Sequence, residues 1–182
     1  RERILFDGDR EARGKAFFSI GDFAVSPDHR LLGWSCDELG SEFHTIRVRD
    51  LATGKELDDK VERSDGAIVW TADNAAFYYV RLDDSHRSSQ VFRHRLGTDA
   101  AQDELVYEEL DARWFVHVRR SQSRAFAIVS VSDHDSSESH LLDLSDPQAQ
   151  ARIIEPRRDG VRYDVEHRDD ELFIRTNADE AE

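Results

Sequence analysis

The chain repeats one pattern at intervals of about 45 to 50 residues, and this period limits its possible folds more than any other feature. Each copy is a small polar turn followed by an apolar stretch. The first three turns begin at Ser26, Thr71 and Ser121, and a looser fourth copy spans Arg168–Arg175. Self-similarity at a fixed spacing is the signature of a fold built from repeated supersecondary units.

A second element keeps the same period. It consists of residues 45–51, 90–96 and 139–144, in which apolar and polar side chains alternate before a turn of Gly, Asp, Ser or Pro. Alternation of this kind predicts a strand with one buried face. The turn residues accept the backbone angles that a tight reversal requires.

Each repeat therefore predicts about four short strands. The first strands are expected at residues 23–25, 68–70 and 115–118, and two of the fourth strands near residues 105–107 and 153–154. Four strands in this length are typical of a propeller blade. We predict an all-β partial β-propeller of about three and a half four-stranded antiparallel blades. An immunoglobulin-like or jelly-roll sandwich is the competing fold, but it does not need equal spacing.

The predicted blade limits cover the whole chain as one partial domain. The expected parts are residues 1–16 with the outer strand of a preceding blade at Ile4–Phe6, whole blades at 17–61, 65–109 and 113–156, and the start of another blade at 157–182, with its inner half at Tyr163–Thr176. The chain has no methionine and begins with Arg. We therefore expect an internal fragment whose ends cut through blades.

The composition narrows the possible partners. The net charge of −14 argues against nucleic-acid binding, which needs a basic surface, and predicts a solvated acidic surface. No apolar run approaches the roughly 20 residues of a membrane-spanning helix. The single cysteine excludes a disulfide scaffold or a four-cysteine zinc site and favours the reducing cytoplasm. Partners are accordingly expected to include neither nucleic acid nor membrane.

No residue stands out as catalytic. The Gly-x-Ser-x-Gly motif of α/β-hydrolases is absent, and its nearest match, Gly33–Asp37, lacks the second glycine and lies on a predicted strand. We interpret Ser35 as a blade residue. Cys36 is predicted to be a small buried side chain rather than a nucleophile. No catalytic residue is assigned, and the substrate-binding residues are left unknown.

The sequence also predicts no metal site and no cofactor. No His-x-x-x-His or Glu-x-x-His pair on a helix is formed by the histidines. The eight histidines are His29, His44, His86, His94, His117, His134, His140 and His167. The acidic segment Asp133–Asp135 lacks the glycine of an EF-hand and is expected to be a loop between strands.

Three tryptophans recur at similar places in the repeats: Trp34, Trp70 and Trp114. At strand positions they are interpreted as core between blades rather than as a stacking platform. Asp58–Asp59 and Asp83–Asp84 are expected in loops.

Beyond these patterns, an ordered series of segments resembles the oligopeptidase B branch of the prolyl oligopeptidase family of serine peptidases. The segments are Phe17–Gly21, Val25–Asp28, Ile46–Gly54, Phe77–Arg81, Val91–Thr98, Leu105–Glu109, Ser137–Asp143, Tyr163–His167 and Thr176–Asn177. The pairing of Phe92-Arg93-His94 with Tyr107-Glu108-Glu109 is especially typical of this branch.

The resemblance implies a cytoplasmic two-domain enzyme, in which a seven-bladed propeller caps an α/β-hydrolase domain. It implies cleavage of short peptides after Arg or Lys, with the propeller excluding folded proteins. The family's catalytic Ser, Asp and His, and the carboxylates that hold the basic substrate residue, belong to the hydrolase domain. The chain is thus expected to be a non-catalytic gating segment. Its partners would be that domain of the same parent chain and short basic peptides. The alternative is a stand-alone propeller that binds proteins.

Open strand edges suggest one further partner. Three and a half blades leave unpaired edges, which are pairing hazards. Two copies could close a ring of seven blades if Ile4–Phe6 of one copy completed the half blade at Tyr163–Thr176 of the other. A homodimer is therefore a hypothesis.

Overall fold

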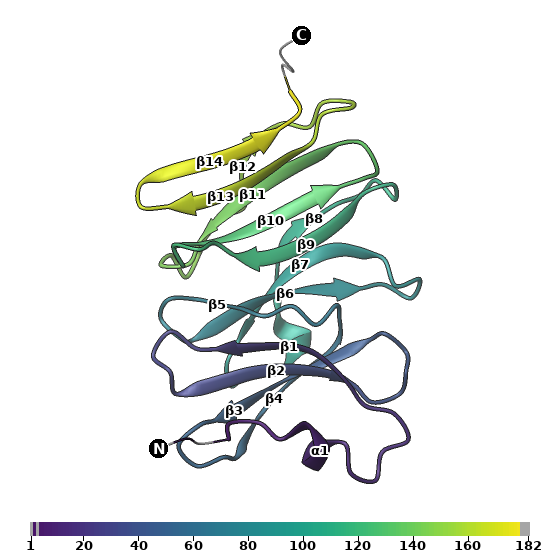
Figure 1. Cartoon of the computed structure of the whole chain (residues 1–182), viewed down its shortest axis with the longest axis vertical. Helices are drawn as coiled ribbons and strands as arrows, with labels where there is room; N and C mark the ends of the chain where they lie inside the picture. Colours follow the sequence, from purple (N-terminus) through teal and green to yellow (C-terminus); the bar gives the residue numbers. More distant parts are fainter. Residues whose placement is uncertain (1, 3, 179–182) are drawn as a thin grey trace.

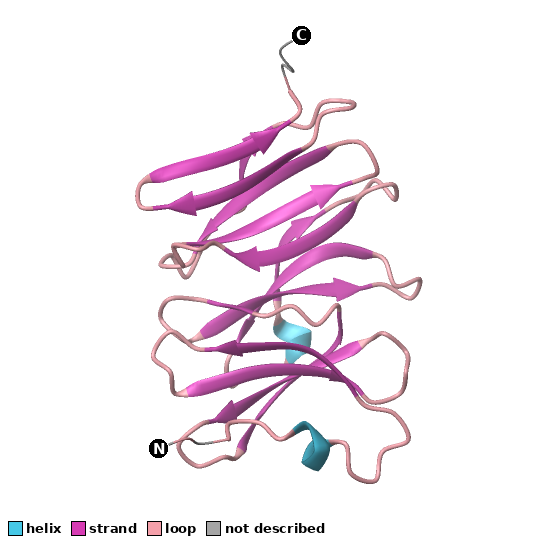
Figure 2. Ribbon diagram, in the orientation of Figure 1, coloured by secondary structure: helices cyan, strands magenta, loops and turns pink. Residues whose placement is uncertain are grey.

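The computed structural model describes residue 2 and residues 4–178, and strands dominate it (Figure 2). The strands are β1 Ser19–Val25, β2 Leu31–Asp37, β3 His44–Asp50, β4 Glu56–Ser64, β5 Val69–Trp70, β6 Ala76–Leu82, β7 Ser88–Arg95, β8 Glu104–Glu108, β9 Phe115–Arg120, β10 Phe126–Ser132, β11 Ser137–Asp143, β12 Arg152–Glu155, β13 Tyr163–Arg168 and β14 Glu171–Thr176. A one-turn helix, α1 (Gly8–Glu11), and a 3₁₀ turn, η1 (Ala100–Gln102), complete the elements. None of the described helices is long and apolar enough to cross a membrane.

The strands form antiparallel blades that follow one another along the long axis of the molecule (Figure 1). Strands β1–β4, β5–β8 and β9–β12 make three blades, and the hairpin β13–β14 begins a fourth. A single pair, Ser64 with Arg81, joins the first blade to the second through β4 and β6. The predicted all-β class and the partial propeller of antiparallel blades are confirmed.

The polar turns of the repeat share one pattern of side-chain hydrogen bonds. Ser26 Oγ donates to Asp28 Oδ1 at 2.6 Å and accepts from Leu31 N at 3.0 Å. Thr71 repeats this with Asp73 at 2.6 Å and Ala76 N at 3.1 Å. Such side-chain caps satisfy backbone donors where the chain reverses.

The same turns share a backbone feature at their tips. His29, Asn74 and Arg124 occupy equivalent positions with φ of 61°, 63° and 63°. This left-handed conformation is uncommon for residues with a side chain, so its repetition shows that the turn is one recurring structure.

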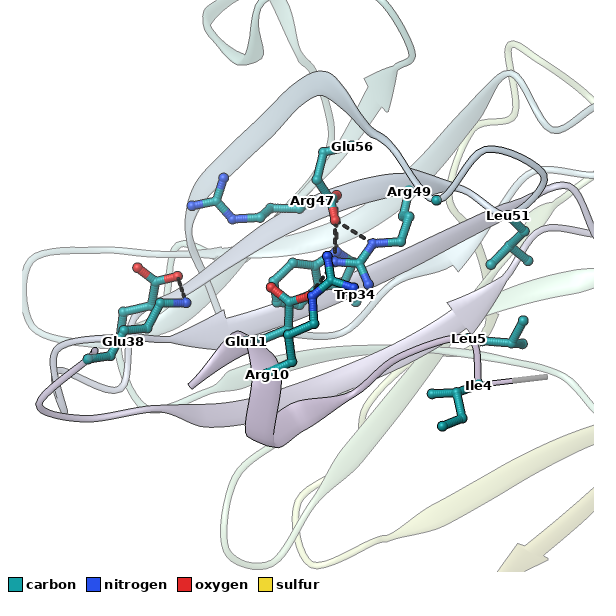
Figure 3. A pocket seen from close by; sticks show the side chains of 12 residues that line it. Ile4, Leu5, Arg10, Glu11, Trp34, Glu38, Arg47, Arg49, Leu51 and Glu56 are labelled. Atoms are coloured by element: carbon teal, nitrogen blue, oxygen red, sulfur yellow. Dashed lines mark hydrogen bonds and ion pairs between the residues drawn. The ribbon is translucent and has the colours of Figure 1, made fainter. Parts of the chain in front are cut away.

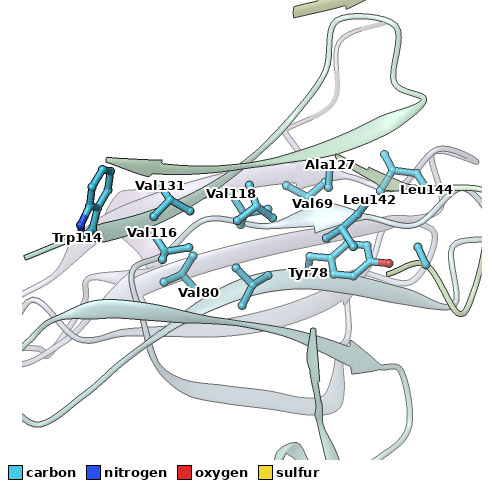
Figure 4. Packing of buried hydrophobic residues seen from close by; sticks show 13 residues of the cluster. Val69, Tyr78, Val80, Trp114, Val116, Val118, Ala127, Val131, Leu142 and Leu144 are labelled. Carbon is cyan, nitrogen blue, oxygen red and sulfur yellow. The ribbon is translucent and has the colours of Figure 1, made fainter. Parts of the chain in front are cut away.

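The core lies between the blades, because each inner sheet is covered on both faces. Along β6, Phe77 and Tyr79 point towards the first blade, whereas Tyr78 and Val80 point towards the third. Figure 4 shows the second of these layers, where Tyr78 and Val80 meet Val116 and other side chains of the third blade. Alternate side chains of a strand leave opposite faces, so a strand buried on both sides carries an unbroken apolar run.

Two predictions about strands need comment, and the structure corrects one of them. Residues 4–6 form no strand: the segment is irregular, and the Phe6 ring packs on Phe23 and Trp34 at centroid distances of 4.7 and 4.9 Å. A strand needs a hydrogen-bonded neighbour, and the strands of the preceding blade are not part of this chain, so the outer strand at Ile4–Phe6 stays a prediction. Asp58 and Asp59 lie within β4 rather than in a loop, and Asp59 is buried.

Candidate functional site

The first strands of successive blades converge. β1 contacts β5, and β5 contacts β9. Because the innermost strands of a propeller surround its central channel, these strands form the channel side of the chain. Any solute that passes through the channel meets their exposed side chains.

A hollow of about 450 Å³ opens where these three strands meet. We call it the inner hollow. Its apolar wall includes Val25, Val69 and Val118, and its charged rim includes Arg120 and Arg124. A concave site with an apolar wall and a few convergent polar groups is the usual form of a small-ligand site.

The charges around the inner hollow do not cancel. Asp22 Oδ1 accepts from Phe23 N at 2.7 Å, and its Oδ2 accepts from Ile68 N at 3.3 Å, so backbone donors already occupy this carboxylate. Arg119 forms an ion pair with Glu166 at 2.8 Å. Neither Arg120 nor Arg124 has a hydrogen-bonded or ion-paired side chain among the described residues.

The two free arginines influence each other. Partial burial and the charge of Arg124 lower the pKa of Arg120, while Asp22 opposes them. An arginine stays protonated at neutral pH despite such a shift, because its ordinary pKa lies far above neutrality. Asp22 therefore offsets part of the positive charge, and the inner hollow keeps an excess of positive charge from Arg120 and Arg124.

A buried serine holds the edge of this hollow in place. Ser35 Oγ donates to the carbonyl of Gly66 at 2.8 Å and accepts from the backbone N–H of Asp22 at 2.9 Å. β1 has a register shift between Ile20 and Phe23, and the hydroxyl satisfies the backbone there. Ser35 lies in β2, as predicted, and its hydroxyl bonds only backbone atoms.

Cys36 follows Ser35 and is buried, as predicted. Burial, assisted by the charge of Glu38, raises the pKa of the Cys36 thiol to about 11. Because the thiolate is the nucleophile, a thiol with such a pKa is unreactive near neutral pH.

The remaining side chains singled out from the sequence are distributed through the fold. The three tryptophans are buried in three different hydrophobic clusters that lie against successive blades: Trp34, Trp70 and Trp114. Their interpretation as core residues is therefore correct. Asp133–Asp135 and Asp83–Asp84 lie in loops between strands, as expected. No group of three or more His, Cys, Asp or Glu side chains within the described part of the chain could hold a metal ion.

Sequence reasoning missed a buried charged group around His94. Its Nδ1 lies 2.8 Å from Asp103 Oδ1, and its Nε2 lies 3.1 Å from Asp59 Oδ1. Both ring nitrogens face carboxylates, and only an imidazolium can donate from both. Burial opposes that charged form, but the hydrogen bonds and charges of Asp103 and Asp59 outweigh it and raise the pKa of His94.

A second buried charged group joins the second and third blades. Arg157 donates to Glu138 through Nε at 2.9 Å and through Nη2 at 2.8 Å, and also to Glu109. Its guanidinium carbon lies 4.0 Å from the ring centroid of Trp114. We call these residues the Arg157 clamp. One signal for it was present: alternation along β11 places Glu138 on the same face as the buried Leu142.

A second hollow of about 450 Å³ lies on the other face of the first blade, beneath the N-terminal segment (Figure 3). At its centre Arg49 bridges Glu11 at 2.9 Å and Glu56 at 2.5 Å, and Glu56 also accepts from the Trp34 indole at 3.2 Å. Arg49 therefore stands between two carboxylates and has no charge left for a ligand. Arg10 and Arg47 also line this second hollow, but three carboxylates, Glu11, Glu38 and Glu56, offset most of its positive charge. A single carboxylate, Asp22, lines the inner hollow, which is therefore the stronger candidate for recognition of an anion.

Comparison with known proteins gives a consistent result. The profile of the prolyl oligopeptidase N-terminal β-propeller domain matches residues 1–182. Over 99% of its length the chain is 37% identical to dipeptidyl aminopeptidase BI of Pseudoxanthomonas mexicana, and over 97% it is 34% identical to Protease 2 of Moraxella lacunata. It covers 25% and 26% of these relatives, so it spans about a quarter of their length.

Solved structures agree with this. Oligopeptidase B from Leishmania major superposes with a TM-score of 0.92 at 30% identity, covering 96% of this chain and 25% of that one. Oligopeptidase B from Trypanosoma brucei, in a closed form with covalently bound antipain, gives 0.88 at 34% identity, covering 97% and 25%. The repeated blades, the ordered family segments and these similarities agree: the chain belongs to the prolyl oligopeptidase family and corresponds to its N-terminal β-propeller domain.

Proposed function

We propose that this propeller is the non-catalytic gate of a cytoplasmic serine oligopeptidase that cleaves short peptides on the carboxyl side of Arg or Lys. The observation that carries the proposal is the match of the whole chain to the family's propeller domain, together with 34% identity to Protease 2. The propeller would dock on an α/β-hydrolase domain of the same protein, which would supply the nucleophile.

The structure supports a gating role in a physical way. Buried charged groups link neighbouring blades: His94 in β7 contacts Asp59 in β4, and Arg157 contacts Glu109 across the second and third blades. Removing one partner of such a group leaves a buried charge uncompensated, so the blades resist separation. A stiff channel wall can exclude folded proteins while short peptides pass.

The specificity is tested on the natural-length protein with fluorogenic peptides that differ only in the residue before the scissile bond. We expect kcat/KM to be at least about tenfold higher for Arg and Lys than for Pro or Ala, and a serine-directed phosphonate to abolish it. The 182-residue chain alone should show no hydrolysis. A preference for Pro, or hydrolysis by the isolated chain, would contradict the proposal. A natural-length protein without any peptidase activity would instead favour the stand-alone binding propeller.

The gate is tested by placing the same cleavable peptide bond, on the carboxyl side of Arg, in three contexts. These are a short peptide, a long unfolded polypeptide and a surface loop of a folded protein. We expect cleavage to fall in that order, with the folded protein left intact. Equal cleavage of the short peptide and the folded protein would refute gating, even if the preference for Arg held.

A second candidate activity comes from the relative that is 37% identical, which is named a dipeptidyl aminopeptidase. Release of dipeptides needs a free amino terminus, whereas internal cleavage does not. Acetylating the amino terminus of an Arg-containing substrate distinguishes the two. Undiminished cleavage supports the oligopeptidase, and complete loss supports the dipeptidyl aminopeptidase.

A further inference from the structure

We propose that the inner hollow binds a carboxylate of a peptide, held by Arg120 and Arg124 against the apolar wall formed by Val25, Val69 and Val118. The hollow lies where β1, β5 and β9 meet, and its place on the channel side follows from the position of innermost strands in a propeller. Only the identity of the ligand as a peptide rests on the proposed function.

The charge pattern is the first argument. The chain as a whole carries a net charge of −14, yet this hollow has two free guanidinium groups at its rim and a single carboxylate that backbone N–H groups already occupy. Arginine presents N–H donors in a planar fork that matches a carboxylate. An anion entering the hollow therefore finds unused guanidinium donors, and the two arginines outnumber the one carboxylate, Asp22, that opposes it.

The placement of the two arginines is the second argument. Arg120 ends β9, and Arg124 stands four residues later at the tip of the β9–β10 turn. The turn is held by Arg124 N donating to Ser121 O at 3.0 Å, so the backbone of Arg124 is fixed beside Arg120. Like charges held together repel each other, and a shared anion relieves that repulsion.

The shape of the hollow is the third argument. Its volume of about 450 Å³ suits the end of a peptide rather than a small inorganic ion alone. Val69 and Val118 are buried in the wall below the charged rim. A peptide terminus has the matching combination of an anionic group beside an apolar side chain.

The test measures binding separately from hydrolysis, in the natural-length protein. The probes are acetyl-Ala-Ala-Leu with a free carboxylate, the same peptide as its C-terminal amide, acetyl-Glu-Ala-Leu amide, and inorganic phosphate. None of the peptides contains Arg or Lys. We expect the free acid to bind at least about tenfold more tightly than the amide, and added salt to weaken it.

The variants pair a loss of charge in the hollow with the same loss elsewhere. Arg120→Gln/Arg124→Gln should weaken binding of the free acid about tenfold or more, whereas Arg120→Lys/Arg124→Lys should retain part of it. Arg113→Gln/Arg158→Gln is the matched control, since it also removes two positive charges and both side chains are exposed outside the inner hollow. Thermal unfolding curves verify that each variant is folded.

Each outcome decides the proposal. Equal binding of acid and amide, or an unchanged affinity in a folded Arg120→Gln/Arg124→Gln variant, overturns it. Binding of phosphate as tight as that of the free acid shows a site for small anions and overturns the peptide assignment. Tight binding of the Glu peptide amide identifies an acidic side chain as an accepted form of the carboxylate. A protein that binds the acid but hydrolyses nothing refutes only the proposed function.

Discussion

Ser35 joins the first two blades through one hydroxyl group. It bonds the carbonyl of Gly66, in the connection from β4 to β5, and the backbone N–H of Asp22 in β1. Gly66 adopts φ of +104°, and a Cβ added there would lie 3.2 Å from Ser35 Oγ. The glycine is therefore required both by its conformation and by the close approach of the serine.

The substitution Gly66→Ala should lower the free energy of unfolding by about 1–3 kcal/mol, through backbone strain and crowding of Ser35. Gly54→Ala is the control: Gly54 also has positive φ, +73°, but nothing lies within 4 Å of an added Cβ. Chemical denaturation of both variants checks this. Equal losses would show that the contact with Ser35 adds nothing to the conformational strain.

His94 should make stability depend on pH. Because its pKa is raised above 6.5 in the folded chain, its stabilising contribution is fully present below pH 6.5 and is lost as the pH rises through the raised value. The free energy of unfolding should therefore fall as the pH rises above about 6.5 and through the raised pKa of His94.

His94→Gln should flatten that part of the pH profile in denaturation curves, whereas His134→Gln, in an exposed loop, should leave it unchanged. A wild-type profile that is flat or rises over this range would show that His94 is held neutral.

At the level of single residues, the amino-acid types alone predicted part of what the structure shows. The burial of Cys36 and of the three tryptophans follows from apolar character at strand positions. The pairing of His94 with Asp59 and Asp103 does not, because the three residues belong to separate elements that meet only in the folded chain. Such non-local contacts leave no local pattern in the sequence.

Among the elements, strands with clear alternation were predicted and β4 was not. Its sequence is mostly polar, and only Asp59, Val61 and Ser64 are buried. β4 is the outer strand of its blade, so most of its side chains face water and the apolar signal is weak. The segment Ile4–Phe6 is apolar but pairs with no strand of this chain.

The Arg157 clamp acts between elements, since it connects β11 with the segments that follow β8 and β12. Arg157→Met should lower the free energy of unfolding by about 3–5 kcal/mol, because Glu109 and Glu138 would remain buried without their cation. Urea denaturation measures the loss.

The neighbouring Arg158, which is exposed, provides the matched control, and Arg158→Met should change stability by about 0.5 kcal/mol or less. Adding Glu109→Gln and Glu138→Gln to Arg157→Met should recover part of the loss. A loss in the single variant no larger than that of the control would mean that the carboxylates find other partners.

For the molecule as a whole, the repeat period was enough to predict stacked blades. The fold is modular: each blade packs mainly on its neighbours, so the spacing of the turns carries the architecture. The period did not reveal what lies at the two ends of the stack. At one end Phe6 covers part of the first blade, and at the other Leu172, Phe173 and Ile174 of β14 are exposed.

The exposed side chains of β14 should make the isolated 182-residue chain associate as its concentration rises, because an open apolar edge is a template for pairing. Phe173→Lys should reduce this association, and Arg168→Lys, at an exposed site that keeps its charge, should not. Sedimentation velocity distinguishes these states. A monomer at every concentration would also exclude the ring of two copies, whose joining strand at Ile4–Phe6 is not formed.

The turn that closes each inner hairpin has the same conformation in several blades. Its shape depends on the hydroxyl and acceptor at its base, and its tip carries His29, Asn74 or Arg124 without a change of backbone. Chemistry at the tips can therefore vary while the fold stays constant. A single codon change at one tip can alter the charge that the turn presents, so propellers of one lineage can diversify at their surface without having to fold anew.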